Sequence, residues 1–397
     1  MISAGSLLLA AMAMLLAVPS AVFAVEICAA VFLPHRIDRS QAMAARRARI
    51  AVLIPAHNEA RGLLATLSDI RPQLHPSDRL LVVADNCTDE TATIAASVAA
   101  EVVVRSDLTK IGKGYALDWG LNYLALNPPE IVIMIDADCR LAEDAIDRLA
   151  SVCEQSQRPV QSLYLMVASE GSPINHQVAE FAWRVRNWVR PLGLMALSLP
   201  CQLMGSGMAF PWTVIRSVEL SSAHIVEDLR LGLDLANSGC APIFCPSAVV
   251  TSTFPSSAEG AKGQRRRWEH GQIGLVLTTA IPRLLQAAKE GNPNLLALVL
   301  DLVVPPLSLF LILLIVMLIV SGLALLLGLD AAAFTISLGC VVVVSLATML
   351  AWVSRGREVL PLRSLMLVPS YFLAKFRQYV AAVLGERVSQ WVRADRG

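Results

Sequence analysis

Two aspartates, Asp136 and Asp138, come directly after the apolar run IVIMI. A carboxylate at the end of such a run is costly to bury unless something there uses it. Residues i and i+2 of an extended chain point to the same side, and two carboxylates on one side suit a hard divalent cation that in turn binds phosphates. The pair therefore predicts a metal–phosphate site, against the weaker alternative that each aspartate caps the next helix.

Other polar residues stand in similar places. The apolar run IAVLIP passes into the turn PAHNE, and the run RLLVVAD ends at Asp85, where helix capping and ligand binding are equally open. The segment TKIGKGYAL brings Lys110 and Lys113 close to two glycines. It suits a diphosphate, but it lacks the spacing of a P-loop and is by itself a basic loop.

Two further clusters of charge follow along the chain. Glu227 and Asp228 open the amphipathic segment IVEDLRLGLDL, where they either stabilise a helix N-terminus or provide a general base for an acceptor hydroxyl. The segment GQRRRWEHG at 263–271 places three arginines just before the longest apolar stretch. On composition alone it is either a positive-inside membrane anchor or a solvated basic face.

The composition is that of a membrane protein. Of 397 residues, 55% are hydrophobic and 16% are charged, whereas a typical soluble protein has roughly 25% charged residues. The net charge of +1 does not favour nucleic acid as a partner. Eight scattered cysteines without a C-x-x-C pair argue against a zinc site or a disulfide framework, and they fit a cytosolic soluble part.

Alternating short apolar runs and helical patterns occupy the globular part of the chain. Strands are expected at 50–55, 79–85, 101–105 and 130–138, with helical stretches at 59–71, 89–99 and 113–125. This alternation predicts an α/β fold with a mostly parallel sheet that is covered on both faces. Ligands of such sheets bind at the carboxyl ends of the strands, where the polar residues above are placed.

Long apolar segments flank this globular part. Residues 6–33, 295–328 and 332–353 are each long enough to span a bilayer. Arginines follow the first and the last of them, so the positive-inside rule places the N-terminus outside and the globular part in the cytosol.

These segments predict four domains. They are an N-terminal transmembrane helix in 1–35, a cytosolic domain in 50–290, a transmembrane hairpin in 295–353, and an interfacial amphipathic helix with a cytosolic tail in 359–397. Whether 359–384 spans the membrane or lies on it stays open, and the segment FAWRVRNWVR at 181–190 has the same interfacial character.

Several motifs together resemble those of the family-2 glycosyltransferases. In chain order they are PAHNE, the strand end at Asp85, DAD, GSG at 205–207, VED and QRRRW. They are similar in particular to the membrane-bound branch that contains cellulose, hyaluronan and poly-N-acetylglucosamine synthases. The resemblance covers about residues 50–275 and implies a GT-A-type nucleotide-sugar-binding domain. The segment DNCTDE departs from the family's frequent DDxSxD, and three spans are few for a polymer synthase.

The resemblance implies a donor site. The residues that line the pocket for the nucleotide's base and ribose are Pro55, His57, Asn58, Glu59 and Asp85. Lys113 contacts the donor diphosphate, and Asp136 and Asp138 hold Mg²⁺ or Mn²⁺ on that diphosphate.

The resemblance also implies a catalytic and acceptor site. Asp228 matches the catalytic base, with Glu227 beside it. Gln264, Arg267 and Trp268 match the motif Q-x-x-R-W, in which the arginine binds the leaving diphosphate and the tryptophan helps to form the acceptor site.

The function implied by this resemblance is an inverting, metal-dependent hexosyltransferase. It moves a sugar from a nucleotide-sugar donor, by our interpretation a UDP-sugar, to a lipid-linked or polysaccharide acceptor. It acts at the cytosolic face of the bacterial inner membrane, among membrane lipids, in surface or exopolysaccharide biosynthesis. One alternative is a processive synthase that also translocates its product. Another is a non-catalytic nucleotide-sugar-binding membrane protein, which the presence of the base and of both D-x-D carboxylates disfavours.

Overall fold

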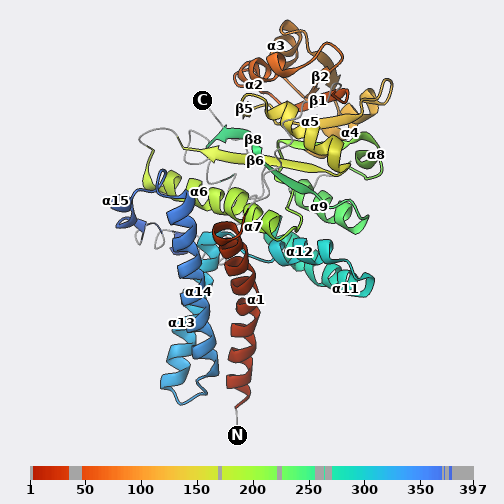
Figure 1. The fold of residues 1–397 in the computed structure, drawn as a ribbon. Coiled ribbons are helices and arrows are strands. Elements are labelled where there is room, and N and C mark those ends of the chain that lie inside the picture. Colours follow the sequence, from red (N-terminus) through yellow and green to blue (C-terminus); the bar gives the residue numbers. More distant parts are fainter. Residues whose placement is uncertain are drawn as a thin grey trace. The chain divides into compact units, whose positions relative to one another are not determined.

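The computed structural model describes residues 3–34, 47–168, 172–220, 226–254, 263, 271–368, 371 and 375–377. These residues fall into two compact units (Figure 1). The helical unit is drawn from Met1–His35, Ala168–Leu197 and Val299–Arg393. The sheet unit is drawn from Arg36–Val167, Ser198–Leu298 and Ala394–Gly397. Residues 168–197, which lie inside the globular stretch of the sequence, thus group with the apolar helices.

An eight-stranded sheet forms the core of the sheet unit. Its strand order is β3 (Glu101–Arg105), β2 (Arg79–Asp85), β1 (Ile50–Ala56), β4 (Ile131–Met134), β7 (Met208–Pro211), β6 (Val160–Val167), β8 (Ile243–Thr253) and β5 (Arg140–Leu141). The first four strands are parallel, and β6 pairs in parallel with β8. β7 runs antiparallel to both of its neighbours, and β5 runs antiparallel to β8. The mostly parallel sheet expected from the sequence is therefore confirmed.

Helices cover both faces of this sheet. Leu53 and Leu81 of β1 and β2 share one core cluster with residues of α4 (Lys113–Leu124) and α9 (Glu227–Asn237). Because side chains alternate along a strand, the buried Val52 and Ile54 point to the other face. α5 (Ala145–Ser156) packs against β4, β6, β7 and β8. Burial on both sides explains why these strands are continuous apolar runs.

The remaining elements of the sheet unit are short connections and surface helices. They are α2 (Leu63–Ile70) with the 3₁₀ turn η1 (Arg71–Gln73), α3 (Thr91–Ser97), α8 (Trp212–Ile215), the π-turn η3 (Val276–Ala280) and α11 (Ile281–Glu290). The predicted strands at 79–85 and 101–105 coincide with β2 and β3, whereas the strand expected at 130–138 ends at Met134. That expectation was wrong because the chain turns after Ile135, so Asp136 and Asp138 lie in a turn and not on an extended strand.

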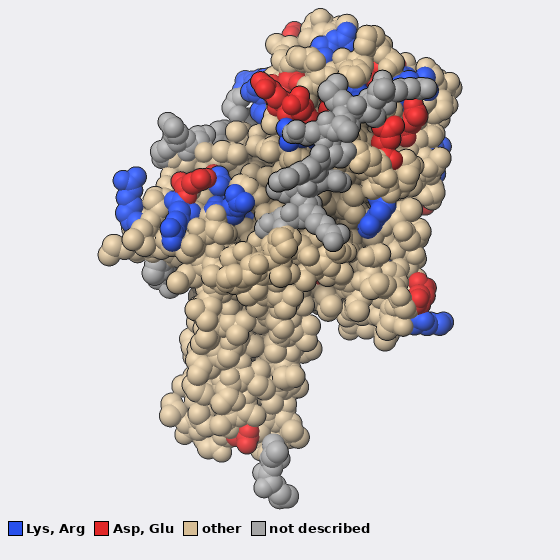
Figure 2. Space-filling view, viewed as in Figure 1, with Lys and Arg blue, Asp and Glu red and all other residues tan. Residues whose placement is uncertain are grey.

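Three helices of the helical unit are long and apolar enough to cross a membrane, among the residues that the structure describes. They are α1 (Ala4–Phe32), α13 (Leu307–Leu326) and α14 (Ala332–Arg355), and α14 packs against both others. Figure 2 shows these helices almost free of charged side chains on the face drawn. The apolar stretch at 295–328 is not one span, because Pro305 and Pro306 separate α12 (Pro293–Leu302) from α13.

A buried ionic cluster lies within the helical unit. α6 (Ile174–Arg184), the π-turn η2 (Val185–Val189) and α7 (Arg190–Ala196) follow one another without a break. Arg190 Nε donates to Glu26 Oε2 of α1 at 2.6 Å, and Arg190 Nη2 donates to Asp301 Oδ1 at 2.5 Å. All three side chains are buried, where a charge needs a partner. Glu26 and Asp301, which the sequence places near the ends of apolar segments, are thus the partners of Arg190.

An aromatic–cationic cluster lies close to this ionic cluster in the sequence, around Trp188 of η2. The ring of Trp188 lies 5.8 Å from the guanidinium carbon of Arg184 and 4.5 Å from that of Arg355, at the end of α14. These are cation–π contacts. The segment at 181–190 therefore combines an aromatic–cationic cluster with a buried ion cluster, and the interfacial interpretation does not apply to Arg190. Of the segment 359–384, α15 (Leu362–Leu365) is described, and most of the rest lies outside the described residues.

Gly193 of α7 provides a test of the packing between α1 and α7. A Cβ at this position would lie 1.9 Å from the carbonyl oxygen of Glu26. Because the obstacle is backbone, the two helices must separate, and overpacking of this kind costs about 1–3 kcal/mol. We expect Gly193→Ala to lower the thermal unfolding midpoint of the purified protein in detergent.

Gly339→Ala on α14 is the matched control, because nothing lies within 4 Å of the added Cβ. Alanine favours helix over glycine by about 1 kcal/mol, so the midpoint of this variant should stay or rise. Equal midpoints for Gly193→Ala and the wild type would contradict the packing described here.

Candidate functional site

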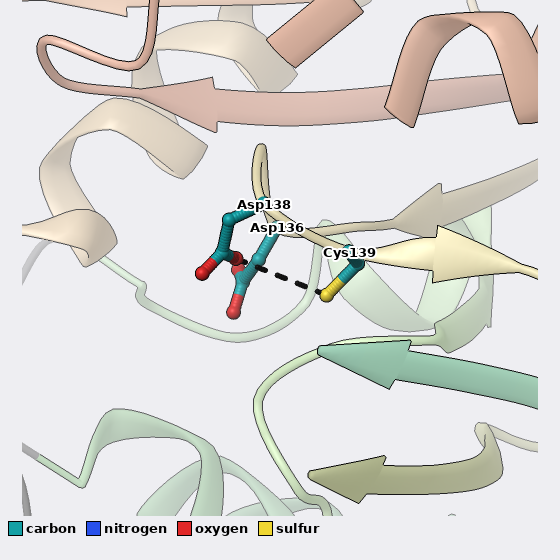
Figure 3. Close-up of side chains that lie close together, drawn as sticks. All are labelled: Asp136, Asp138 and Cys139. Carbon is teal, nitrogen blue, oxygen red and sulfur yellow. Dashed lines mark hydrogen bonds between the residues drawn. The ribbon is translucent and has the colours of Figure 1, made fainter. Parts of the chain in front are cut away.

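The carboxylates of Asp136 and Asp138 lie on the same side of the turn after β4 (Figure 3). The turn is closed by a hydrogen bond from Cys139 N–H to Asp136 O at 3.2 Å. One ligand atom from each of Asp136, Asp138 and Cys139 lies within 4.8 Å of the others. The turn thus brings the two carboxylates together, as the sequence predicts, although by a different backbone geometry.

The donor set in this turn fits a hard cation. The Cys139 sulfur is buried and lies 3.2 Å from Ser206 Oγ. Burial, together with the charge of Asp136, raises the pKa of Cys139 to about 12, so the group is a neutral thiol and not a thiolate ligand. Two carboxylates remain, which suit Mg²⁺ or Mn²⁺ and leave further coordination positions for phosphate or water oxygens.

The segment GSG holds this turn in place. Ser206 Oγ accepts a hydrogen bond from Asp136 N–H at 3.0 Å, and Gly207 N–H donates to Met134 O at 3.0 Å. A Cβ on Gly207 would lie 1.8 Å from Ser162 Oγ, and its φ of +67° also favours glycine. The motif resemblance includes GSG, but its role in positioning Asp136 could not be inferred from the sequence.

Lys113 reaches the same place from the first turn of α4. Its ammonium group forms an ion pair with Asp136 Oδ1 and donates to Gly205 O at 2.6 Å. Burial lowers the pKa of Lys113, but the carboxylates of Asp136, Glu227 and Asp228 outweigh burial and hold this pKa above its ordinary value. Lys113 therefore stays protonated and carries a positive charge at the D-x-D turn.

Glu227 and Asp228 are the first two residues of α9 and face this cluster. A Cβ on Gly205 would lie 3.4 Å from Asp228 Oδ2 and 3.9 Å from Lys113 Nζ, which places Gly205 beside both groups. Burial raises the pKa of Glu227 to about 7, and the charge of Asp228 adds to this effect while Lys113 opposes it. The two residues thus lie at a helix N-terminus and beside a charged cluster, and the general-base role of Asp228 stays a prediction.

The turn PAHNE is joined to the loop after β2. His57 Nδ1 lies 2.7 Å from Asp85 O, and Asn58 Oδ1 accepts from Thr88 N–H at 2.7 Å. Glu59 N–H donates to Thr91 Oγ1 at 2.8 Å. These hydrogen bonds bring the residues after Pro55 to the end of β2. Because β1 is the parallel neighbour of β2 and β4, this group shares one sheet edge with the D-x-D turn.

Asp85 has a buried partner that the sequence interpretation missed. Arg105 Nη1 donates to Asp85 Oδ1 at 2.5 Å, and Arg105 Nη2 donates to Lys110 O at 2.8 Å. The two residues end the adjacent parallel strands β2 and β3 in register. Because both strands were predicted with these ends, the pairing could have been predicted from the sequence. Asp89, in contrast, bonds to the start of the next helix, because its Oδ1 accepts from the N–H of Thr91, the first residue of α3.

The site residues predicted from sequence thus fall into two described groups. The first surrounds the D-x-D turn and contains Lys113, Asp136, Asp138, Glu227 and Asp228. The second, at the ends of β1 and β2, contains Pro55, His57, Asn58, Glu59 and Asp85. Gln264, Arg267 and Trp268 lie outside the described residues, so their roles remain predictions.

Comparisons with known proteins identify the family of the chain. The profile of the family described as glycosyltransferase-like family 2 matches residues 47–271. An uncharacterized glycosyltransferase of Mycobacterium tuberculosis is 33% identical over 145 residues, which are 34% of this chain and 59% of that protein. YdaM, a probable glycosyltransferase of Bacillus subtilis, is 24% identical over 247 residues, which are 58% of this chain and 56% of that protein. The chain therefore matches less than two thirds of the length of each relative.

One solved structure is similar over most of both chains. The mannosyltransferase PcManGT from Pyrobaculum calidifontis, in complex with GDP-Man and Mn²⁺, has a TM-score of 0.52 and 18% identity. The match covers 87% of this chain and 98% of that chain. It confirms the expected GT-A-type α/β fold, and the three apolar helices of the described residues fit the expected transmembrane helices.

The strand that follows the D-x-D turn offers a test by pH. Asp69 of α2 accepts from Arg140 Nε at 2.6 Å and from Leu141 N–H at 3.0 Å, and the Arg140 hydrogen bonds hold the pKa of Asp69 below its usual range. A lowered carboxyl pKa stabilises the fold above the unfolded pKa, about 3.9, and this stabilisation is lost as pH falls through the folded pKa. We expect Asp69→Asn to lower the unfolding midpoint at pH 7, with a difference that shrinks below about pH 4.

Asp144→Asn is the control for this measurement. Its ion pair with Arg148 spans 4.0 Å and its side chain is exposed, so the midpoint should change little at any pH. A difference between Asp69→Asn and wild type that stays constant from pH 7 to pH 3 would argue against the ion pair as its source.

Proposed function

Because the chain belongs to glycosyltransferase family 2, whose profile covers residues 47–271, we propose that it transfers a sugar from a nucleotide-sugar donor to an acceptor at the membrane. The observation that carries this proposal is the convergence of Asp136, Asp138, Lys113 and Asp228 at the carboxyl edge of a parallel sheet. This edge is where open α/β sheets bind nucleotides.

The donor is held, in this proposal, by both described groups of residues. Pro55, His57, Asn58, Glu59 and Asp85 form the wall for the base and ribose, and Lys113 contacts the diphosphate. Asp136 and Asp138 would hold Mg²⁺ or Mn²⁺, which supplies positive charge to the diphosphate as it leaves. The Mn²⁺ and GDP-Man of the similar mannosyltransferase support this choice of ligand class, and a UDP-sugar is the donor that we favour here.

Asp228 is the proposed general base. It takes the proton of the acceptor hydroxyl while the acceptor oxygen forms a bond to the anomeric carbon. The bond from that carbon to the diphosphate oxygen breaks at the same time, so the sugar is transferred with inversion and the nucleoside diphosphate leaves. Glu227, with its pKa of about 7, is the neighbouring carboxyl that competes for this role. Arg267 and Gln264 on the leaving diphosphate and Trp268 at the acceptor complete the proposal.

The membrane setting supports an acceptor that is itself at the membrane. Three helices of the described chain are long and apolar enough to cross a bilayer. Arginines follow the first and the third of them, and by the positive-inside rule this supports the proposed placement of the sheet unit on the cytosolic side of a bacterial inner membrane, with the N-terminus outside. A lipid-linked or polysaccharide acceptor is therefore the proposed partner, in surface or exopolysaccharide assembly.

Replacement of the base tests the mechanism. We expect Asp228→Asn to reduce sugar transfer about 10²–10⁴-fold, because the acceptor proton loses its carboxylate. EDTA should abolish transfer, and Mn²⁺ or Mg²⁺ should restore it. Washed membranes that contain the protein are incubated with UDP-, GDP- and dTDP-sugars labelled in the sugar, and label is followed into organic-soluble and high-molecular-weight fractions.

Asp234→Asn is the matched control on the same helix, since Asp234 pairs with Arg283 away from the D-x-D turn. It should transfer sugar at close to the wild-type rate. Label in the organic phase identifies a lipid acceptor, and label in large material identifies a polymer synthase. A loss in Glu227→Gln with full activity in Asp228→Asn would instead assign the base to Glu227.

A further inference from the structure

Lys113, the proposed ligand of the donor diphosphate, is already paired with a carboxylate of the chain. Its ammonium group does not point into open space but pairs with Asp136 Oδ1, one of the two carboxylates that the D-x-D turn offers to a cation. A second anchor, the hydrogen bond from Nζ to Gly205 O at 2.6 Å, keeps the group there. The protein thus places its own cation on a metal-binding carboxylate.

The charge around Lys113 explains why a cation is needed there. Asp136, Glu227 and Asp228 all act electrostatically on Lys113, and Asp138 lies beside Asp136 in the same turn. Carboxylates gathered in one place repel one another unless a positive charge lies among them. Without metal or donor, Lys113 supplies that charge from within the chain.

We propose that Lys113 is a built-in counter-cation that competes with the divalent metal for Asp136 and leaves it when the donor diphosphate arrives. This inference rests on the proposed function and adds to it an order of events. The metal alone meets a carboxylate that is already paired, so it binds weakly. A nucleoside diphosphate attracts the ammonium group away, so the metal and the nucleotide bind cooperatively.

The surroundings of Lys113 allow this movement. Its backbone begins α4, and the adjacent turn of that helix is fixed by the buried Ala116 and Leu117. The ammonium group lies at the end of a flexible four-carbon side chain, which can change its conformation while the backbone of α4 stays in place. Gly205 adds no side chain beside the ammonium group, and a Cβ there would lie 3.9 Å from Nζ and 3.4 Å from Asp228 Oδ2.

The affinity of the protein for Mn²⁺ in the absence of nucleotide distinguishes this proposal from other roles of Lys113. Binding is measured on the full-length protein in detergent by the loss of the free Mn²⁺ signal in electron paramagnetic resonance, with and without UDP or GDP. We expect Lys113→Met to bind Mn²⁺ alone more tightly, on the order of tenfold, since a like charge near the ion is removed. The gain in Mn²⁺ affinity that the nucleotide produces should shrink in the same variant.

Two further variants make the result decisive. Lys110→Met removes the same charge from an exposed side chain three residues before Lys113 and should leave the Mn²⁺ affinity unchanged. Lys113→Gln removes the charge and keeps a donor for Gly205 O, so it replaces Lys113→Met if that variant does not fold. It should show the same tightening.

The outcomes distinguish this inference from the proposed function. If Lys113 were only a diphosphate ligand, its replacement would leave the affinity for Mn²⁺ alone unchanged, and if it only held the turn in shape, that affinity would fall. Either result in the folded Lys113 variants overturns the competition. A wild-type protein that binds no Mn²⁺ even with UDP or GDP overturns the metal-dependent function, and the competition with it.

Discussion

Like-charge repulsion at the carboxyl edge of the sheet is the constraint on which the site depends. Asp136, Asp138, Glu227 and Asp228 come from two elements far apart in the sequence and meet near one ammonium group. Carboxylates this close cannot all stay ionised without a compensating cation. The ion pair of Lys113 compensates this repulsion, and the charge of Asp228 adds to the burial that raises the pKa of Glu227. The repulsion also makes the edge a place where a divalent cation with a diphosphate can be exchanged for an internal charge.

Hydrogen bonds to the D-x-D turn keep its two carboxylates close together. Ser206 holds the N–H of Asp136, Thr66 Oγ1 of α2 donates to Ala137 O at 2.8 Å, and Asp69 fastens the strand that follows. Thr66 and Asp69 belong to α2 and Ser206 lies just before β7, so the turn cannot relax without disturbing the sheet and α2. Preorganised charge of this kind stabilises a transition state because no reorganisation is needed during the reaction. The movable part of the site is then the Lys113 side chain.

In the helical unit, a buried ion cluster holds the helices in place. Apolar helices pack without strong directional preference, whereas the hydrogen bonds of Arg190 with Glu26 and Asp301 fix the order and register of three segments. A buried ion cluster contributes little net stability against an apolar replacement, but the loss of one partner leaves an unpaired buried charge. The close approach of Gly193 to the backbone of α1 is compatible with this register. Charge thus specifies the arrangement in both units.

The sequence predicts the local elements of this fold better than the contacts between distant residues. β2 and β3 were predicted residue by residue, because a buried parallel strand is a local apolar run with polar ends. The fourth strand was placed too long, since the partners that end it, Ser206 and Gly207, lie about seventy residues away. The pairing of Asp85 with Arg105 could have been found, because both residues end adjacent strands at one edge. The pairing of Asp136 with Lys113 could not, because the motif resemblance assigns both residues to the donor diphosphate and its metal, and only the folded chain shows that they also pair with each other.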